Sequence, residues 1–140
     1  MKDNRVFIDT NIFIYTILTE NQAREKRDKA ISLLQSLSDK VVFINTQVLN
    51  EIYSVMLRHE IEEKDIQEKL EVIIRETRLS IIRLKTVKRC WELRMKYKYS
   101  YWDCLIMASA LENQCAILYT EDMQHQQQIE QSLRIINPFG

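Results

Sequence analysis

Four acidic residues of this chain are placed so that their carboxylates could share one site. Asp9 directly follows the apolar run at residues 6–8, and Asp122 follows the apolar run at residues 116–119. Runs without polar alternation are typical of strands buried in a parallel sheet, and ligands of open α/β sheets bind at the carboxyl ends of such strands. Glu51 and Asp103 lie early in predicted helices that follow strands. We therefore expect all four carboxylates to converge at one edge of the sheet.

The chemistry of such a cluster depends on what neutralises its charge. The motifs that contain the four acids, at residues 7–11, 46–51, 100–103 and 119–122, include no Lys, His or Arg. The carboxylates would therefore repel one another unless a divalent cation bound to them. Sites with oxygen ligands alone favour Mg²⁺ or Mn²⁺. A glycine-rich phosphate loop is excluded, because the sole glycine is Gly140.

Two of the acids also have a purely structural interpretation. Asp9 or Thr10 could cap a short helix that begins near Ile12, because both side chains accept hydrogen bonds from free backbone amides. Ser100, followed three residues later by Asp103, is similar to a capping box at the start of a helix. For these positions the sequence leaves capping and chemistry open.

Glu51 has unusual neighbours for a charged residue. At helical spacing it shares a face with Val48 and Val55, which predicts partial burial. Burial of a carboxylate costs several kcal/mol unless a partner or a metal ion compensates the charge. We favour a metal or active-site role for Glu51, and a buried ion pair with an Arg is the alternative.

The elements that must position these residues alternate between strand and helix. Strands are expected at residues 6–8, 41–44, 79–84, 116–119 and 133–136, and a short apolar segment at 12–18. Helices are expected at 22–37, 46–58 with Thr46 as N-cap, 62–77, 86–96, 100–112 with Asn113 as C-cap, and 124–131. This order predicts a single domain over residues 1–140, an α/β three-layer sandwich with a mainly parallel five-stranded sheet and helices on both faces.

Composition narrows the class of protein. Lys and Arg together number 20, as do Asp and Glu, so no global field attracts a polyanion. The three cysteines are odd in number and lack metal-ligand spacing, which favours reduced core thiols. No segment has the roughly 20 apolar residues of a membrane span, and we expect a cytoplasmic protein. With one glycine available, turns are expected to use Asn21, Asp39, Asn45 and Asn113.

One segment concentrates positive charge. Residues 83–98 contain seven basic residues and one acidic residue, interleaved with Trp91, Tyr97 and Tyr99. Cations beside aromatic rings suit a nucleic-acid backbone and unpaired bases. A solvated helix face with Trp91 in the core is the alternative. The candidate RNA-binding residues are Lys88, Arg89, Arg94, Lys96 and Lys98.

Taken together, the four acidic motifs and the closing Asn-Pro-Phe at residues 137–139 resemble the PIN-domain ribonucleases. More narrowly, the chain is similar to the VapC toxins of bacterial type II toxin–antitoxin pairs. The resemblance implies that Asp9, Glu51, Asp103 and Asp122 form an acidic metal site. It further implies that Asn11 and Thr120 orient the carboxylates or the attacking water, and that Glu121 is a possible extra carboxylate.

The resemblance also carries expectations about activity and partners. It implies Mg²⁺- or Mn²⁺-dependent endonucleolytic cleavage of RNA, with tRNA, rRNA or mRNA as substrate. It implies a cognate antitoxin protein that covers the site, and a homodimer. Relatives commonly place glycine near the turn at residues 113–114 and near Gln126, where this chain has Asn, Gln and Gln. These departures affect the geometry of loops more than the carboxylates.

Three other classes of protein share parts of this arrangement of acidic residues. A Mg²⁺-dependent phosphoacceptor signalling domain would use Thr120 as a switch hydroxyl, but it needs a Lys at the end of a late strand, where this chain has Asn137-Pro138. A haloacid-dehalogenase-type phosphatase needs Asp at the position of Asn11. A non-catalytic nucleic-acid or partner-binding module with a PIN-like fold would have no need of all four acids.

Overall fold

The computed structural model describes residues 4–18 and 24–140, whose strands form one six-stranded sheet. The strand order is β3-β2-β1-β4-β6-β5, and every pairing is parallel except that of β5 with β6. The predicted α/β fold with a mostly parallel sheet is confirmed, but the predicted count of five strands is wrong by one. The strands are β1 (Arg5–Ile8), β2 (Val41–Asn45), β3 (Arg78–Ser80), β4 (Ile117–Tyr119), β5 (Gln128–Ile129) and β6 (Leu133–Ile136).

The sheet is held by the apolar runs that predicted its strands. Phe7 and Ile8 of β1, Ile44 of β2 and Leu118 of β4 are fully buried. β1 lies between β2 and β4, with Phe7 in register with Phe43 and with Leu118. Burial on both faces explains why these runs show no polar alternation. The central position of β1 places its carboxyl end, and so Asp9, in the middle of one sheet edge.

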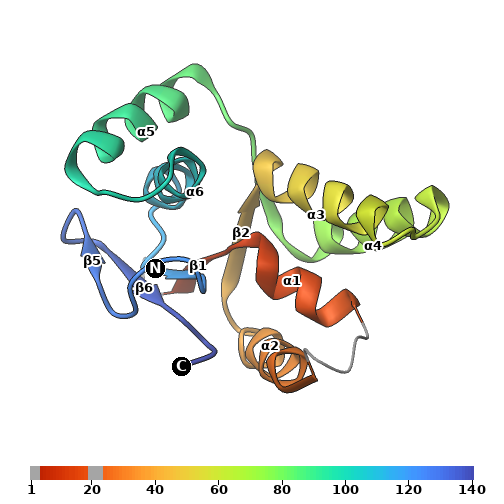
Figure 1. Ribbon diagram of the computed structural model, residues 1–140. Coiled ribbons are helices and arrows are strands. Elements are labelled where there is room, and N and C mark those ends of the chain that lie inside the picture. The colour runs from red at the N-terminus through yellow and green to blue at the C-terminus, as the bar shows by residue number, and fades with distance from the viewer. Residues whose placement is uncertain (1–3, 19–23) are drawn as a thin grey trace.

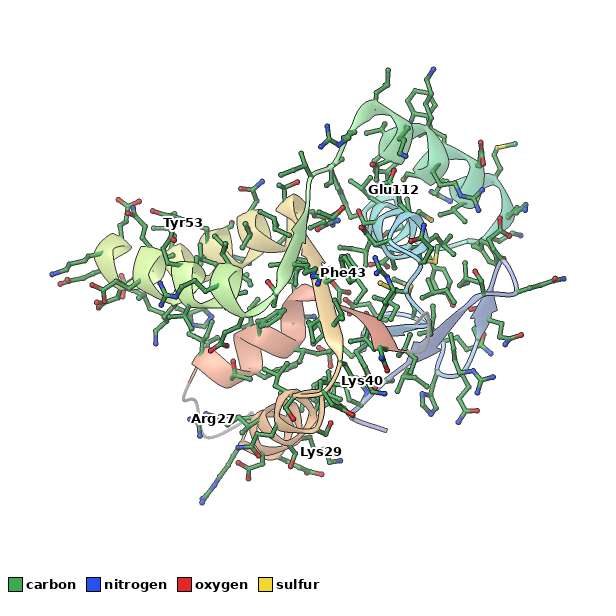
Figure 2. All side chains as sticks on the ribbon, turned by 180° about the vertical axis from the view of Figure 1, so that it is seen from behind. Arg27, Lys29, Lys40, Phe43, Tyr53 and Glu112 are labelled. Atoms are coloured by element: carbon green, nitrogen blue, oxygen red, sulfur yellow. The ribbon has the colours of Figure 1, made fainter. Side chains whose placement is uncertain are left out.

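Six helices cover the two faces of the sheet in the part of the chain that the structure describes (Figure 1). α5 and α6 pack together on one side, and α1 to α4 lie on the other. Figure 2 shows Phe43 near the centre of the molecule and Lys29 on the outer side of α2. The helices are α1 (Thr10–Ile17), α2 (Arg24–Ser36), α3 (Thr46–Arg58), α4 (Glu63–Glu76), α5 (Leu84–Lys96) and α6 (Tyr101–Glu112).

The helix ends agree with the sequence analysis at two caps and differ at one. Ser100 caps α6, because its side chain accepts a hydrogen bond from the backbone N–H of Asp103, and Asn113 is the C-cap. At α3 the predicted N-cap Thr46 is wrong. The cap is Asn45, whose side chain accepts from the backbone N–H of Val48 at 3.0 Å. Asn45 is the last residue of β2, so strand and cap share one residue.

The predicted helix at residues 124–131 is absent. The polar segment instead forms turns and the short strand β5, which pairs with β6 and is itself the edge strand of the sheet. Ile129 and Leu133 are fully buried at this pairing. The burial of these two side chains stabilises β5, whereas a Gln-rich helix would offer no apolar face to the sheet. The third predicted strand is also shorter than expected, since β3 ends at Ser80 and not near residue 84.

Asp39 and Asn113 lie in turns, as predicted, whereas Asn45 ends β2 and the left-handed backbone is adopted by other residues. In the described part of the chain, the non-glycine residues with positive φ are Glu60, Gln114, Gln126, Glu130 and Gln131, with φ between 51° and 69°. Asn21 lies outside the described residues. Gln114 and Gln126 are at or beside the positions where the resemblance implied glycine. The chain therefore keeps the left-handed backbone there and accepts the steric cost, about 1–2 kcal/mol per residue for a side chain other than glycine.

Two other expectations concern the cysteines and the membrane. Cys90, Cys104 and Cys115 are buried and free, as predicted for core thiols. Among the helices in residues 4–18 and 24–140, none has the length and apolar character to cross a membrane.

Candidate active site

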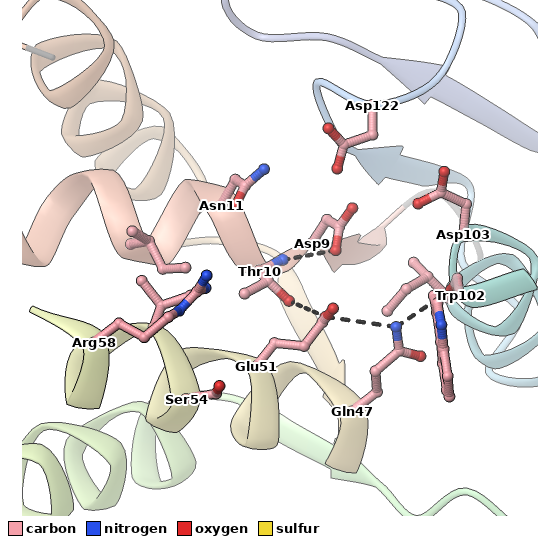
Figure 3. A pocket seen from close by; sticks show the side chains of 13 residues that line it. Asp9, Thr10, Asn11, Gln47, Glu51, Ser54, Arg58, Trp102, Asp103 and Asp122 are labelled. Atoms are coloured by element: carbon pink, nitrogen blue, oxygen red, sulfur yellow. Dashed lines mark hydrogen bonds between the residues drawn. The ribbon is translucent and has the colours of Figure 1, made fainter. Parts of the chain in front are cut away.

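Three of the four predicted acids meet at the carboxyl edge of the sheet. One carboxylate oxygen each of Asp9, Asp103 and Asp122 lies within 4.8 Å of the other two. We call these three residues the acidic trio. They line a pocket of about 500 Å³, the carboxylate pocket, in which their side chains point toward one another (Figure 3). Asp9 follows β1, Asp103 lies in α6 and Asp122 follows β4, so the fold brings Asp9 to two acids that are more than 90 positions further along the chain.

Asp9 both caps α1 and faces the pocket, so the two interpretations of its role are compatible. Its Oδ1 accepts from the backbone N–H of Thr10 at 2.7 Å, and its Oδ2 accepts from the hydroxyl of Thr120 at 2.8 Å. Burial raises the pKa of Asp9 from 3.8 to about 7. The two hydrogen bonds oppose this rise, and the charges of Asp122 and Glu51 add to it.

Asp103 and Asp122 are less buried and titrate in the same direction. Burial raises the pKa of both carboxyls. The charge of Glu51 raises that of Asp103 further, and the charge of Asp103 raises that of Asp122. The Thr120 hydroxyl links two members of the trio, because it accepts from the backbone N–H of Asp122 at 3.2 Å while it donates to Asp9. At Asp122 the charge of Lys26 lowers the pKa, but it does not outweigh burial and the neighbouring carboxylates.

Glu51 lies across the carboxylate pocket and outside the trio. Its Oε1 accepts from the hydroxyl of Thr10 at 2.7 Å and from Nε2 of Gln47 at 3.5 Å. The alternative of a buried ion pair is not observed, since no salt bridge joins Glu51 to an Arg within the described residues. Glu51 is therefore held by neutral donors, and its carboxylate faces the pocket.

Thr120 and Asn11, for which the resemblance implied an orienting role, contact different carboxylates. Thr120 donates to Asp9, as described above. Asn11 lines the pocket and donates to Oε1 of Glu121 at 3.2 Å. Glu121 itself faces away from the trio and pairs with Nζ of Lys26 at 2.8 Å. The hydroxyl of Tyr15 donates to the same carboxylate at 2.6 Å. We call Glu121, Lys26, Tyr15 and Asn11 the Glu121 cluster.

The family model of the PIN domain matches residues 6–129 of this chain. This chain belongs to the PIN domain family. A search of curated proteins found no matching sequence. The family assignment therefore rests on the family model, and it agrees with the fold and with the position of the acidic trio.

Solved structures share the PIN fold of this chain at low sequence identity. A toxin–antitoxin complex from Klebsiella pneumoniae is 18% identical with a TM-score of 0.67, covering 95% of this chain and 97% of that chain. VapC20 from Mycobacterium tuberculosis, a sarcin-ricin loop cleaving toxin, is 17% identical with a TM-score of 0.65, covering 81% and 86%. VapBC2 from Rickettsia felis, bound to a DNA fragment from its promoter, is 20% identical with a TM-score of 0.68, covering 95% and 99%.

Sequence reasoning missed one side of the pocket of this PIN domain. Gln47, Ser54 and Arg58 line the pocket together with Glu51. The four residues recur at intervals of four, three and four, which places them on one face of α3. The helical spacing of these residues from Glu51 is the sequence signal that indicates this polar stripe. Trp102, next to Asp103, also lines the pocket.

The basic segment does not form part of the pocket. None of Lys88, Arg89, Arg94, Lys96 and Lys98 is among the residues that line it. Arg89 and Lys96 on α5 pair with Glu130 at 3.1 and 3.0 Å, so part of the positive charge is already neutralised within the PIN domain. The alternative of Trp91 in the core is wrong, because the side chain is 51% exposed. Arg58 is the one cation among the described residues that line the pocket.

Proposed function

We propose that this PIN domain is a metal-dependent endoribonuclease and the toxin of a toxin–antitoxin pair. The observation that carries the proposal is the convergence of three carboxylates with no basic partner, in a chain that belongs to the PIN domain family. The toxins and toxin–antitoxin complexes among the structural neighbours support the biological role. RNA is accordingly the proposed substrate and an antitoxin protein the proposed partner; a homodimer is the proposed assembly.

The donor set of the trio fits Mg²⁺ or Mn²⁺, because it supplies oxygen ligands only and an excess of negative charge. Asp9, Asp103 and Asp122 would hold the ion. When bound, the ion supplies Lewis-acid chemistry, lowering the pKa of water and offsetting charge on the phosphate. The raised pKa values of the trio support this assignment, since the site is unfavourable for three carboxylates without a cation.

The remaining pocket residues orient the reactants. Thr120 and the backbone N–H of Thr10 fix both oxygens of Asp9, which keeps its carboxylate in one rotamer. Glu51, held by Thr10 and Gln47, faces the same space and can orient an attacking water or accept its proton. Arg58 at the far end of the stripe provides a cation for a phosphate of the RNA.

The test is cleavage of a structured RNA, such as a tRNA pool, by purified protein with Mg²⁺ or Mn²⁺. Parallel reactions contain EDTA or the Asp103→Asn variant, whose circular dichroism checks that it is folded. Cleavage that is lost in both reactions is the expected result. RNA binding without any cleavage, with each metal ion, would instead indicate a non-catalytic module.

A further inference from the structure

Trp102 is a large apolar side chain exposed beside the acidic trio. It is 61% exposed, it directly precedes Asp103, and it lines the carboxylate pocket. Its ring meets the ring of Tyr101 edge-on, with centroids 5.4 Å apart. The indole N–H has no hydrogen-bond partner within the described residues. An indole presented to water at this position is held in place on one side and free to contact a ligand on the other.

Trp102 lines both the carboxylate pocket and a second cavity. This cavity has a volume of about 390 Å³ and shares Gln47, Glu51, Ser54 and Trp102 with the carboxylate pocket. Its other walls include the apolar side chains of Ile82 and Leu105 and the polar side chains of Asn50 and Thr46. A flat ring with a polar edge, such as a nucleobase, matches these walls.

Gln47 supplies an independent observation at the boundary of the two cavities. The residue is 9% exposed, and its Nε2 donates to the backbone carbonyl of Trp102 at 3.3 Å. Its Oε1 is buried without a hydrogen-bond partner. A buried acceptor without a donor is destabilising, so the site gains from a ligand that brings an N–H group to this oxygen. Exocyclic amino groups and ring N–H groups of nucleobases are such donors.

We propose, on the basis of the nuclease function above, that Trp102 stacks on an unpaired nucleobase of the RNA beside the cleaved bond. Gln47 and Asn50 contact the polar edge of that base in the second cavity. Base–aromatic stacking is a recurrent device of single-strand recognition, and bases within a duplex are not available to it. Trp102 is therefore a positioning residue for the nucleotide next to the cleaved bond, and that nucleotide has to be unpaired to stack on it.

The arrangement along α3 favours RNA over a protein segment as the occupant. Gln47 and Arg58 mark the two ends of the polar stripe, about 16 Å apart by helix geometry. Trp102 and Arg58 flank the carboxylates on opposite sides of the pocket (Figure 3). An aromatic ring, a metal-binding centre and a cation in this order match a base, the cleaved phosphate and a neighbouring phosphate of one strand.

The first experiment uses the fluorescence of Trp102. The chain has two tryptophans, so Trp91→Phe leaves Trp102 as the sole fluorophore. In the Asp9→Asn background, which is expected not to cleave, short single-stranded RNA of random sequence should quench this fluorescence. The same strands annealed to their complements should quench it weakly or not at all. Equal quenching by single strands and duplexes would overturn the proposal.

The second experiment measures RNA affinity of otherwise unchanged full-length protein under non-cleaving conditions. Trp102→Ala should weaken binding of single-stranded RNA between about fivefold and a hundredfold, and Trp102→Phe should restore most of the affinity. Trp91→Ala is the control at a similarly exposed tryptophan that lines neither cavity, and it should lower the affinity much less than Trp102→Ala does.

The outcomes separate this inference from the nuclease function. If wild-type protein neither binds nor cleaves RNA, both proposals fail. If wild-type protein cleaves RNA and Trp102→Ala binds and cleaves it equally well, only the stacking proposal fails. A Trp102→Ala variant that keeps its RNA affinity but changes mass in light scattering would overturn the proposal and indicate a protein contact at Trp102.

Discussion

Glu121 and Asp122 are adjacent in the chain, yet their carboxylates have opposite electrostatic surroundings. Glu121 receives hydrogen bonds from Lys26, Tyr15 and Asn11, including an ion pair of 2.8 Å. Asp122 faces two other carboxylates, and its pKa is raised by burial and by Asp103. The fold itself thus compensates the charge of the Glu121 carboxylate, whereas the charge of the Asp122 carboxylate stays unbalanced.

The contrast between Glu121 and Asp122 indicates which charges of this molecule are available for function. Charges of the Glu121 cluster connect α1, α2 and the segment after β4, so they stabilise the scaffold. The acidic trio costs stability, because its charges repel one another in a partly buried site. A fold that retains such a cost at the carboxyl edge of its sheet is consistent with a site that binds a cation.

The sharpest test of this comparison exchanges the two neighbours. Asp122→Asn removes one carboxylate of the trio, and we expect cleavage of RNA to fall by roughly a thousandfold or more, because metal-assisted stabilisation of transition-state charge is worth several kcal/mol. Glu121→Gln removes the same charge one residue earlier and should change the cleavage rate by a few-fold at most. Rates are measured with one labelled RNA at saturating Mg²⁺.

Isothermal titration calorimetry with Mn²⁺ tests whether a loss of cleavage in these two variants comes from a loss of metal binding. Asp122→Asn should lose measurable metal binding, and Glu121→Gln should retain it. Equal losses in the two variants would contradict the comparison, because Glu121 would then belong to the metal site.

The second prediction concerns the pH dependence of stability without metal. Asp9 has a pKa of about 7 in the folded protein against 3.8 without burial, so the folded state binds the extra proton between these values. The free energy of unfolding should therefore fall as pH rises from about 4 to 7, by on the order of 3–4 kcal/mol, and level off above 7. The raised pKa values of Asp103 and Asp122 act in the same direction.

Urea unfolding in EDTA at pH 5 and pH 8 measures this effect. The window avoids the lowered pKa of Glu130, whose ion pairs stabilise the fold above its ordinary pKa and are lost only in stronger acid. Asp9→Asn should flatten the dependence, and added Mg²⁺ should stabilise the wild type more at pH 8 than at pH 5. Greater stability of the metal-free wild type at pH 8 would refute the assignment.

The acidic trio was predictable from sequence because parallel topology forces its geometry. Apolar runs mark β1 and β4, and the carboxyl ends of neighbouring parallel strands meet at one edge, so Asp9 and Asp122 had to be close. The sequence predicted Glu51 in one site with the other three acids, and the structure places it in the same pocket but outside the trio. Its exact distance from the other acids depends on how far α3 lies from the sheet. Local sequence patterns do not determine the packing distance of a helix.

The Glu121 cluster was not predictable for a related reason. Lys26 lies in a charged run that is typical of a solvated face, and only the packing of α2 beside α1 brings it to Glu121.

The helix predicted at residues 124–131 was wrong for a different reason. Gln favours helices by intrinsic propensity, but pairing with β6 and the burial of Ile129 outweigh that preference. Gln126 and Gln131 then adopt left-handed backbone without the glycine that usually signals it.

The third prediction breaks the Glu121 cluster directly. Lys26→Met keeps the length of the side chain and leaves Glu121 without its cation, which should destabilise the protein by about 1–3 kcal/mol. The positive charge of Lys26 also lowers the pKa of Asp122, because it disfavours a second positive charge at that carboxylate. Its removal should therefore make the variant bind Mn²⁺ somewhat more tightly. Thermal unfolding and titration calorimetry measure the two effects.

Lys29→Met provides the matched control for Lys26. Lys29 lies on the same helix and pairs with the largely exposed Glu25, so its loss should change stability by less than about 0.5 kcal/mol. An equal effect of both variants would mean that Lys26 acts as an ordinary surface charge.

The smallest expected effect tests the same distinction on α5. Arg89 and Lys96 pair with Glu130, whereas Lys88 and Lys98 have no ion pair within the described residues. If charges already paired in the fold are unavailable to RNA, Lys88→Glu with Lys98→Glu should weaken RNA binding by a few-fold and lower its salt dependence, because fewer counterions are released. Lys96→Gln should leave the salt dependence nearly unchanged and reduce thermal stability slightly. The measurement is RNA affinity against salt concentration for both variants. Identical salt dependence in wild type and in the doubly reversed protein would remove α5 from the RNA-binding surface and leave Arg58 as the principal cation near the pocket.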